Sequence, residues 1–256
     1  MTDSHCHLYL EQFNEDADDV IARATASGVT QFFLPAIDSS THEQMMELES
    51  KYKGICIAMM GLHPCSVKSD FIAELEIIKR YLSQRKFAAI GEIGLDLYWD
   101  KTFLKEQYDA FHEQVNLALQ YSLPMVIHSR EATNECIEVV EQYTGRGLKG
   151  IFHCFGGTTE QAQRIINCGF LLGIGGVVTY KNSGLAEVIK DIDLMHIVLE
   201  TDAPYLSPVP YRGKRNESSY LTFIADKIAS TKNIAPAEVH KATDDNCRSL
   251  FAPIVE

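Results

Sequence analysis

Short apolar runs alternate with longer amphipathic segments along the whole chain, and this alternation limits the possible folds more than any other feature. Runs rich in Val, Ile, Phe and Gly predict eight strands, at residues 2–7, 31–36, 56–61, 88–96, 124–129, 150–154, 170–176 and 197–202. Helical periodicity predicts helices at residues 15–27, 41–52, 71–83, 104–121, 134–143, 185–190, 218–230 and 236–243, and a further helix that begins at Thr158 or Thr159 and is closed by Gly169. Eight strands that alternate with helices favour a parallel (β/α)8 barrel of the TIM type.

An open doubly wound sheet is the alternative fold. It is disfavoured because no glycine-rich phosphate loop follows the first predicted strand. A length of 256 residues suits one barrel, and no linker or change of composition divides the chain. We therefore expect a single domain over residues 1–256.

Composition excludes several classes of protein. No run of apolar residues is long enough to span a bilayer, and the first residues lack the pattern of a signal peptide, so we expect a cytoplasmic protein. The seven cysteines are scattered and include no CxxC pair, which argues against a disulfide framework and a thiolate zinc site. A net charge of −12 argues against coating nucleic acid by bulk electrostatics, but not against local binding of phosphates through metal ions.

Ionisable residues close several of the predicted strands. His5 and His7 lie near the end of the first, and alternate residues of an extended chain point the same way, so both imidazoles can reach one ion while Cys6 faces away. Four later strands also end in ionisable residues: Glu92, His128, His153 and Asp202. The carboxyl ends of barrel strands meet at one mouth, so we expect all six side chains to be neighbours in space.

The chemistry of these six residues favours a metal site. Each alone would more simply be a hydrogen-bonded core residue, but an ionisable group in an apolar run costs several kcal/mol unless it is paired or bound to metal. Imidazole nitrogens and carboxylate oxygens, without thiolates, suit ions such as Zn²⁺, Mn²⁺, Co²⁺ or Ni²⁺. Six donors exceed what one catalytic zinc takes, so the set favours two ions with Glu92, on a middle strand, as the bridge.

Other residues are candidates for contacts with a substrate. His63 follows the third strand on the same side as the six, and is expected to contact substrate or support a ligand. Arg130 follows His128 directly and suits a phosphate, with a salt bridge to a carboxylate as the alternative. A basic patch that could bind phosphate, or be simply solvated, follows the last strand: Arg212, Lys214 and Arg215.

Taken together, the motifs resemble the TatD family of metal-dependent deoxyribonucleases. The resemblance runs in order along essentially the full length, through the segments at residues 4–8 (SHCHL), 61–64 (GLHP), 91–96 (GEIGLD), 127–130 (IHSR), 153–155 (HCF), 200–206 (ETDAPYL), 212–217 (RGKRNE) and 246–251. Two positions depart from the family pattern: Ser218 stands where proline is common, and Tyr9 stands where Asp is frequent. Neither is expected to touch a proposed ligand.

The resemblance implies a site and a reaction. By the family pattern, one divalent cation (Mg, Mn, Zn, Co or Ni) is held by His5, His7 and Asp202, a second by His128 and His153, and Glu92 bridges them. Asp202 would take a proton, and would thus be catalytic together with Glu92, while Glu200 would support a ligand from the same side of the strand. The implied activity is exonuclease-like phosphodiester hydrolysis of DNA. Because the mouth of a barrel is recessed and the chain has no basic track for a duplex, we expect single-stranded or frayed DNA as the substrate, with Tyr205, Tyr211 or Phe155 as candidates to stack on a base. We also expect a monomer.

Two other functions are compatible with the same residues. The barrel and metals could instead hydrolyse a small amide, lactone or phosphoester, although the basic patch and the motifs favour a phosphodiester. A non-catalytic protein that binds metal or nucleic acid is the alternative of a different class, and the full set of ligands argues against it.

Overall fold

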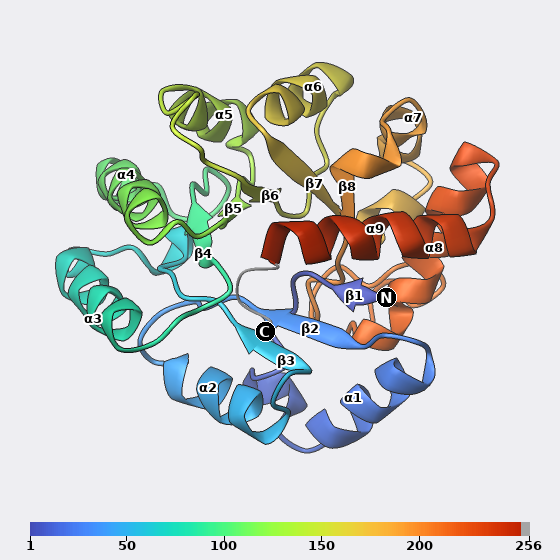
Figure 1. The fold of residues 1–256 in the computed structure, drawn as a ribbon, viewed down its shortest axis with the longest axis horizontal. Coiled ribbons are helices and arrows are strands. Elements are labelled where there is room, and N and C mark those ends of the chain that lie inside the picture. The colour runs from blue at the N-terminus through green and yellow to red at the C-terminus, as the bar shows by residue number, and fades with distance from the viewer. Residues whose placement is uncertain (252–256) are drawn as a thin grey trace.

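The computed structural model describes residues 1–251 and has a ring of parallel strands with helices on the outside (Figure 1). The strands are β1 (Thr2–Asp3), β2 (Gln31–Leu34), β3 (Cys56–Ala58), β4 (Ile90–Gly94), β5 (Met125–His128), β6 (Gly150–Phe152), β7 (Phe170–Ile174) and β8 (Ile197–Leu199). The helices are α1 (Ala17–Ala26), α2 (His42–Lys51), α3 (Phe71–Gln84), α4 (Leu104–Tyr121), α5 (Thr133–Glu141), α6 (Thr159–Asn167), α7 (Leu185–Lys190), α8 (Leu221–Lys232) and α9 (Pro236–Phe251).

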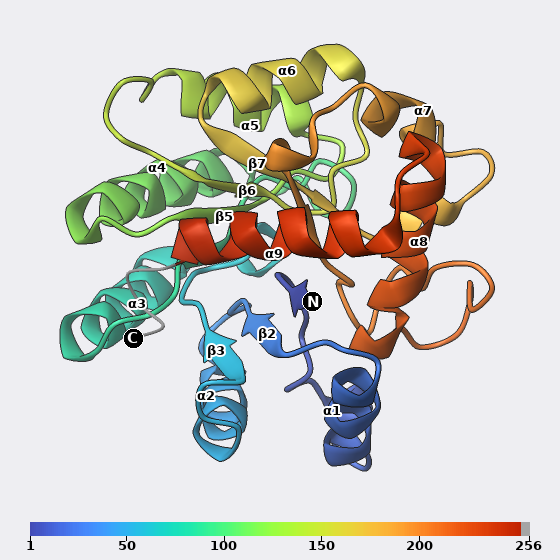
Figure 2. The ribbon, with the colours of Figure 1, turned by 45° about the vertical axis from the view of Figure 1, so that its right-hand side comes forward.

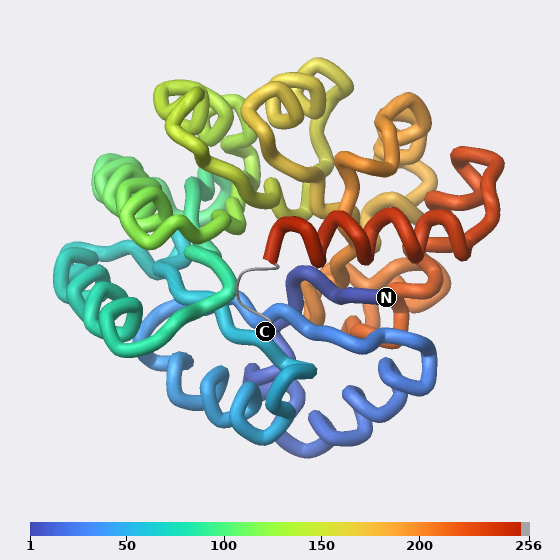
Figure 3. Tube along the Cα trace, in the orientation of Figure 1, coloured from blue at the N-terminus to red at the C-terminus, as the bar shows by residue number. Residues whose placement is uncertain are grey.

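Backbone hydrogen bonds close this ring into a barrel. Regular pairing runs through β1, β2 and β3 in one sheet, and through β4, β5, β6, β7 and β8 in another. Between β3 and β4, the N–H of Ala88 donates to the C=O of Ala58 at 3.0 Å, and the N–H of Ser4 donates to the C=O of Leu199 at 3.0 Å between β1 and β8. The chain trace follows the ring in sequence order (Figure 3). The predicted (β/α)8 barrel is confirmed, and the open sheet is excluded.

Local sequence explains where the elements begin and end. In α6 the hydroxyl of Thr158 accepts from the N–H of Gln161, and the side chain of Gln161 accepts in return from the N–H of Thr158, which is a capping box. Gly169 follows this helix with φ +85°, a left-handed conformation that glycine adopts without strain. Both predicted ends of the helix are confirmed. The helices between strands turn apolar faces inward; α4, for example, buries Phe111 and Val115.

The last helix is longer than the sequence predicted. The predicted helix ends at residue 243, but α9 continues to Phe251 because its inner face repeats buried residues at helical spacing, Val239, Thr243, Cys247 and Leu250 among them. Figure 2 shows α9 lying across the barrel. Asn246 there donates to the C=O of Ile197, at the beginning of β8, and the ring of Phe251 stacks on Phe33 at 4.2 Å. Thus α9 closes the amino-terminal end and leaves the carboxyl ends of the strands open.

Other predicted bounds also differ from the structure. The predicted helix 218–230 is a 3-10 turn, Ser218–Tyr220, followed by α8, which ends at Lys232. The first and last strands end before the ionisable residues that were placed on them. Past β8 the backbone turns at Asp202, whose φ is +56°, so the chain there is no longer a regular strand. No helix in residues 1–251 combines the length and apolar character needed to cross a membrane.

Candidate metal centre at the carboxyl ends of the strands

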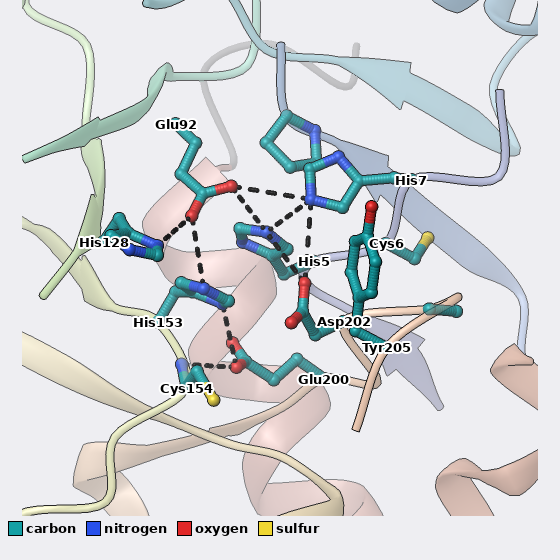
Figure 4. Close-up of polar contacts among 12 residues, drawn as sticks. His5, Cys6, His7, Glu92, His128, His153, Cys154, Glu200, Asp202 and Tyr205 are labelled. Atoms are coloured by element: carbon teal, nitrogen blue, oxygen red, sulfur yellow. Dashed lines mark hydrogen bonds and ion pairs between the residues drawn. The ribbon is translucent and has the colours of Figure 1, made fainter. Parts of the chain in front are cut away.

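The chain just after β1 brings two imidazoles to one point. The N–H of Cys6 donates to the C=O of Phe33 on one side, and the N–H of His7 donates to the C=O of Ala203 on the other. This extended stretch directs His5 and His7 to the same side, with their Nε2 atoms 3.2 Å apart, while Cys6 points away (Figure 4). The expected orientation of the pair is therefore present, although regular strand pairing ends at Asp3.

Glu92, in the middle of β4, lies between two groups of histidines (Figure 4). Its Oε2 is 3.1 Å from Nε2 of His5 and 3.5 Å from Nε2 of His7. Its Oε1 is 2.8 Å from Nδ1 of His128 and 3.3 Å from Nε2 of His153. One carboxylate thus presents a different oxygen to each group, which is the arrangement that a bridging ligand requires.

Asp202 and His63 complete the surroundings of this carboxylate. Oδ1 of Asp202 is 3.6 Å from the Nε2 atoms of both His5 and His7. His63 follows β3, and its Nε2 is 3.4 Å from Oε1 of Glu92. The structure therefore brings together all six residues proposed as ligands and adds His63, which the sequence had placed beside the site.

Electrostatics gives Glu92 and His5 the protonation states that suit a cation. Burial alone would raise the pKa of Glu92, but the neighbouring histidines outweigh it and hold the pKa well below the usual value, so the carboxylate is ionised. Burial and the proximity of His153 lower the pKa of His5 well below the usual value, which leaves its imidazole neutral. A neutral nitrogen and an ionised oxygen are the forms that bind metal. Despite burial, the charge of Glu92 raises the pKa of His153 well above its usual value, and hydrogen bonds to Asp96 and Glu92 raise the pKa of His128, so a cation bound by these two imidazoles would displace their protons.

The residues present fit a metal ion by geometry as well as by donor type. Three sets offer atoms that lie within 4.8 Å of one another: His5, His153 and Asp202; His5, His7 and Glu92; and His63, Glu92 and His128. All the donors are nitrogen or oxygen, which suits a divalent ion of intermediate or hard character. Imidazoles packed this closely against each other are stabilised by a shared cation.

Three of the histidines contact a further polar group through the ring nitrogen that faces away from Glu92. Two of these contacts are made by carboxylates. Nε2 of His128 is 2.8 Å from Oδ2 of Asp96, and Nδ1 of His153 is 3.1 Å from Oε1 of Glu200. In both cases the opposite nitrogen faces Glu92. Partners of this kind select the tautomer and orientation of a metal-binding histidine. Glu200 was expected in this role, whereas Asp96 was not; its place at the end of the 91–96 motif, four residues after Glu92, was the signal available.

The third of these contacts corrects an expectation about Tyr9. Its hydroxyl lies 3.0 Å from Nδ1 of His7 and donates to the C=O of Pro35 at 2.5 Å. A hydroxyl that donates to a carbonyl is free to accept from the Nδ1–H of His7, which turns Nε2 toward Glu92. The expectation that Tyr9 touches no proposed ligand was therefore wrong, because the chain after β1 brings residue 9 back beside residue 7.

The basic candidates lie around the mouth and are already engaged. The guanidinium of Arg130 lies over the ring of Tyr98 at 4.0 Å, and that of Arg212 lies over Tyr180 at 4.5 Å. Lys214 lies 5.8 Å from the ring of Tyr211. Arg215 forms two hydrogen bonds with the carboxylate of Asp16, at 2.8 and 2.6 Å. Their contacts with a substrate stay predictions.

Among the aromatic candidates, Tyr205 alone combines exposure with proximity to the site. It is 48% exposed, and its ring centroid lies 6.4 Å from that of His7. Phe155 is buried, and one face of Tyr211 is covered by Tyr220 at 4.2 Å.

A parallel barrel whose carboxyl ends unite four imidazoles with two carboxylates defines the class of metal-dependent hydrolases built on this fold. The chain belongs to the TatD related DNase family, whose model matches residues 2–252. It is 37% identical to the uncharacterized metal-dependent hydrolase YabD of Bacillus subtilis, over 97% of this chain and 98% of that protein. It is 32% identical to the 3'-5' ssDNA/RNA exonuclease TatD of Klebsiella pneumoniae, over 98% and 97% of the two chains.

Solved structures agree with this assignment. The crystal structure of YjjV, a TatD homologue from Escherichia coli, superposes with a TM-score of 0.92 at 28% identity, covering 98% of each chain.

Proposed function

We propose that this protein hydrolyses phosphodiester bonds of single-stranded or frayed DNA in an exonuclease-like manner. The observation that carries the proposal is the position of Glu92, whose two oxygens each face a separate group of histidines at 2.8–3.5 Å. Sites with two metal ions are common in enzymes that cleave phosphodiesters. The similarity to a relative that is named a 3'-5' ssDNA/RNA exonuclease supports the same substrate class.

Two divalent cations are the proposed cofactors. His5, His7 and Asp202 would hold one, His128 and His153 the other, and Glu92 would bridge them. When bound, such ions lower the pKa of water toward neutrality and neutralise charge on the phosphate. Mg, Mn, Zn, Co and Ni all suit the donor set. The cytoplasmic location and the monomeric state expected from the sequence stay predictions.

The protein's own groups divide the work in this proposal. The side chain of Asp202 is 14% exposed whereas that of Glu92 is 2% exposed, so Asp202 is the carboxylate that faces an incoming water and takes its proton. Glu92 is too enclosed for that role, and serves instead to fix the positions of the two groups of histidines relative to each other. Asp96 and Glu200 keep His128 and His153 turned toward Glu92.

The proposal is tested with end-labelled single-stranded oligonucleotide in Mg²⁺ or Mn²⁺. We expect progressive shortening of the oligonucleotide that stops when a chelator is added. His128→Ala and Asp202→Asn should each lower the rate of shortening by at least ~100-fold. A protein that leaves the oligonucleotide intact but turns over a panel of amides, lactones or small phosphoesters would contradict it. A protein that is unaffected by both substitutions would fit the non-catalytic alternative instead.

A further inference from the structure

An exposed pair of aromatic residues with a cation against it lies on the loop between β4 and α4. Trp99, the one tryptophan of the sequence, is 64% exposed, and Tyr98 is 51% exposed. The guanidinium of Arg130 lies 4.0 Å from the ring centroid of Tyr98 and 5.3 Å from that of Trp99. Rings of this size gain their stabilisation mainly by burial, so this pair has apolar surface available for a ligand. We refer to Tyr98, Trp99 and Arg130 as the aromatic cluster.

Hydrogen bonds hold the aromatic cluster in a defined geometry. Oδ1 of Asp96 accepts from the N–H of Tyr98 at 3.0 Å and from the N–H of Trp99 at 2.9 Å. The N–H of Leu97 donates to the C=O of Arg130 at 3.0 Å, which ties the loop to the residues after β5. A surface that is ordered before a ligand arrives loses less conformational entropy on binding.

The same carboxylate connects the aromatic cluster to the metal centre. While Oδ1 of Asp96 holds the loop, its Oδ2 is 2.8 Å from Nε2 of His128. One side chain therefore separates the cluster from His128, a proposed ligand at the carboxyl end of β5, and the cluster lies just beyond the carboxyl ends of β4 and β5. A molecule that reacts at Glu92 can extend across the cluster.

Arg130 gives the aromatic cluster one positive charge that can face an anion, although the whole chain carries −12. Within residues 1–251, Arg130 forms no ion pair with a carboxylate, so its positive charge is not cancelled by a partner. Nearby, Asp100 on the same loop is paired with Lys68 at 3.6 Å, which reduces the repulsion of an anion by that acid. Aromatic rings beside an arginine are the surface on which proteins stack unpaired bases.

We propose that the aromatic cluster is a stacking site for an unpaired nucleobase of a strand whose phosphodiester lies at Glu92. This inference rests on the proposed function and adds the group that is bound next to the scissile bond. Every base has a π face, so the site selects unpaired over paired bases and not one sequence over another. Phosphate contacts alone would bind a strand with or without bases.

Trp99 supplies a direct measurement of binding, because all tryptophan fluorescence of the protein comes from this one residue. Metal-free protein in a chelator is titrated with a short oligodeoxyadenylate, or with an abasic oligomer of the same length and charge. We expect a saturable change of Trp99 emission with the base-bearing strand, and at least ~10-fold weaker binding of the abasic one. Equal binding of the two strands, or no change with either, would overturn the stacking site.

A second measurement compares turnover in the presence of metal. The ratio of kcat/KM for base-bearing over abasic oligomer is expected to fall at least ~10-fold in Trp99→Ala and in Tyr98→Ala, with partial recovery in Trp99→Phe. Met195→Ala is the matched control, since Met195 is also exposed, at 61%, but lies in the 3-10 turn that precedes β8 at the other end of the barrel. Its ratio is expected to equal that of the parent protein.

The outcomes separate this inference from the proposed function. If both oligomers are hydrolysed and Trp99→Ala leaves the ratio unchanged, the stacking site is wrong and the phosphodiesterase activity stands. If neither oligomer is hydrolysed, the proposed function fails, and the fluorescence titration still decides the stacking site. Trp99 emission that changes with protein concentration, without any oligonucleotide, would assign the cluster to contact between copies of the chain and would also overturn it.

Discussion

The carboxylate of Asp3 accepts hydrogen bonds from both the N–H and the hydroxyl of Thr201, at 2.9 and 2.6 Å, across 198 residues of sequence. Its Oδ1 also lies 3.4 Å from the N–H of His5. One fully buried side chain thus fastens the segment that carries His5 to the segment that carries Asp202. His5 and Asp202, proposed ligands that follow the first and last strands of the barrel, are thus aligned by Asp3, which does not itself face the site.

Asp3→Ala should therefore weaken metal binding and lower stability together. Loss of a buried acceptor leaves the groups of Thr201 without a partner, which costs about 3 kcal/mol of unfolding free energy. Looser alignment of His5 with Asp202 should raise the Kd for Mn²⁺ about tenfold. Denaturant unfolding of metal-free protein and a Mn²⁺ titration measure the two effects. Asp3→Asn keeps one acceptor oxygen and should fall between; an unchanged Kd in Asp3→Ala would refute the alignment.

Tyr9→Phe should act on metal affinity with little effect on packing. The substitution removes the hydroxyl that contacts Nδ1 of His7 and keeps the ring in the core. Without that partner the imidazole is free to rotate or change tautomer, so the Kd for Mn²⁺ should rise about tenfold. Isothermal titration calorimetry of metal-free protein with Mn²⁺ measures this Kd. Tyr81→Phe, in α3 and away from the centre, serves as the control; equal affinities of the two variants would mean that Tyr9 has no role in holding His7.

The parts of this structure that the sequence predicted follow from periodicity. Alternation of apolar runs and helices is repeated along the chain, so it indicates eight strands, and residues that end parallel strands must converge. His128 and His153 could be placed together on that ground alone. The supporting contacts of Asp96 and Tyr9 could not, because they depend on how the chain turns after a strand has ended. Those turns involve single backbone conformations, such as the positive φ of Asp202, that leave no periodic signal.

The same distinction explains the error in the last helix. Residues 244–246, just after the predicted end, are polar, whereas Cys247, Leu250 and Phe251 beyond them fill the amino-terminal end of the barrel. A helix that packs on the end of a barrel needs only a narrow apolar stripe, and a charged turn within it resembles a helix end when it is considered alone.

Phe251→Ala should measure how much this closing helix stabilises the barrel. The ring is buried and stacks on Phe33 at 4.2 Å, so its loss should lower the unfolding free energy by about 3–5 kcal/mol. The metal centre lies at the opposite end, so the Kd for Mn²⁺ should stay within about twofold. Thermal or denaturant unfolding measures the change in unfolding free energy, and titration calorimetry measures the Kd for Mn²⁺. A variant that unfolds like the parent would show that α9 contributes little to the barrel.

The pair formed by Arg215 and Asp16 should stabilise the protein in a pH-dependent way. Hydrogen bonds from Arg215 lower the pKa of Asp16 below its usual value, so the ionised carboxylate is favoured in the folded state. Stability from such a group is present above the unfolded pKa, near 3.8, and is lost as the pH falls through the lower folded pKa. Both side chains are partly exposed, so the pair contributes about 1 kcal/mol, or about 2–4 °C in Tm. Asp16→Asn should thus lower Tm at pH 7, and the difference from the parent should shrink as the pH falls below 3.8 and vanish once the pH is below the folded pKa of Asp16. Arg215→Met should lower Tm in the same way, and the double variant should lower Tm little further than either single one.

A rise in KM for oligonucleotide in Arg215→Met, with Tm unchanged, would instead show that this arginine contacts the substrate, as expected from the sequence.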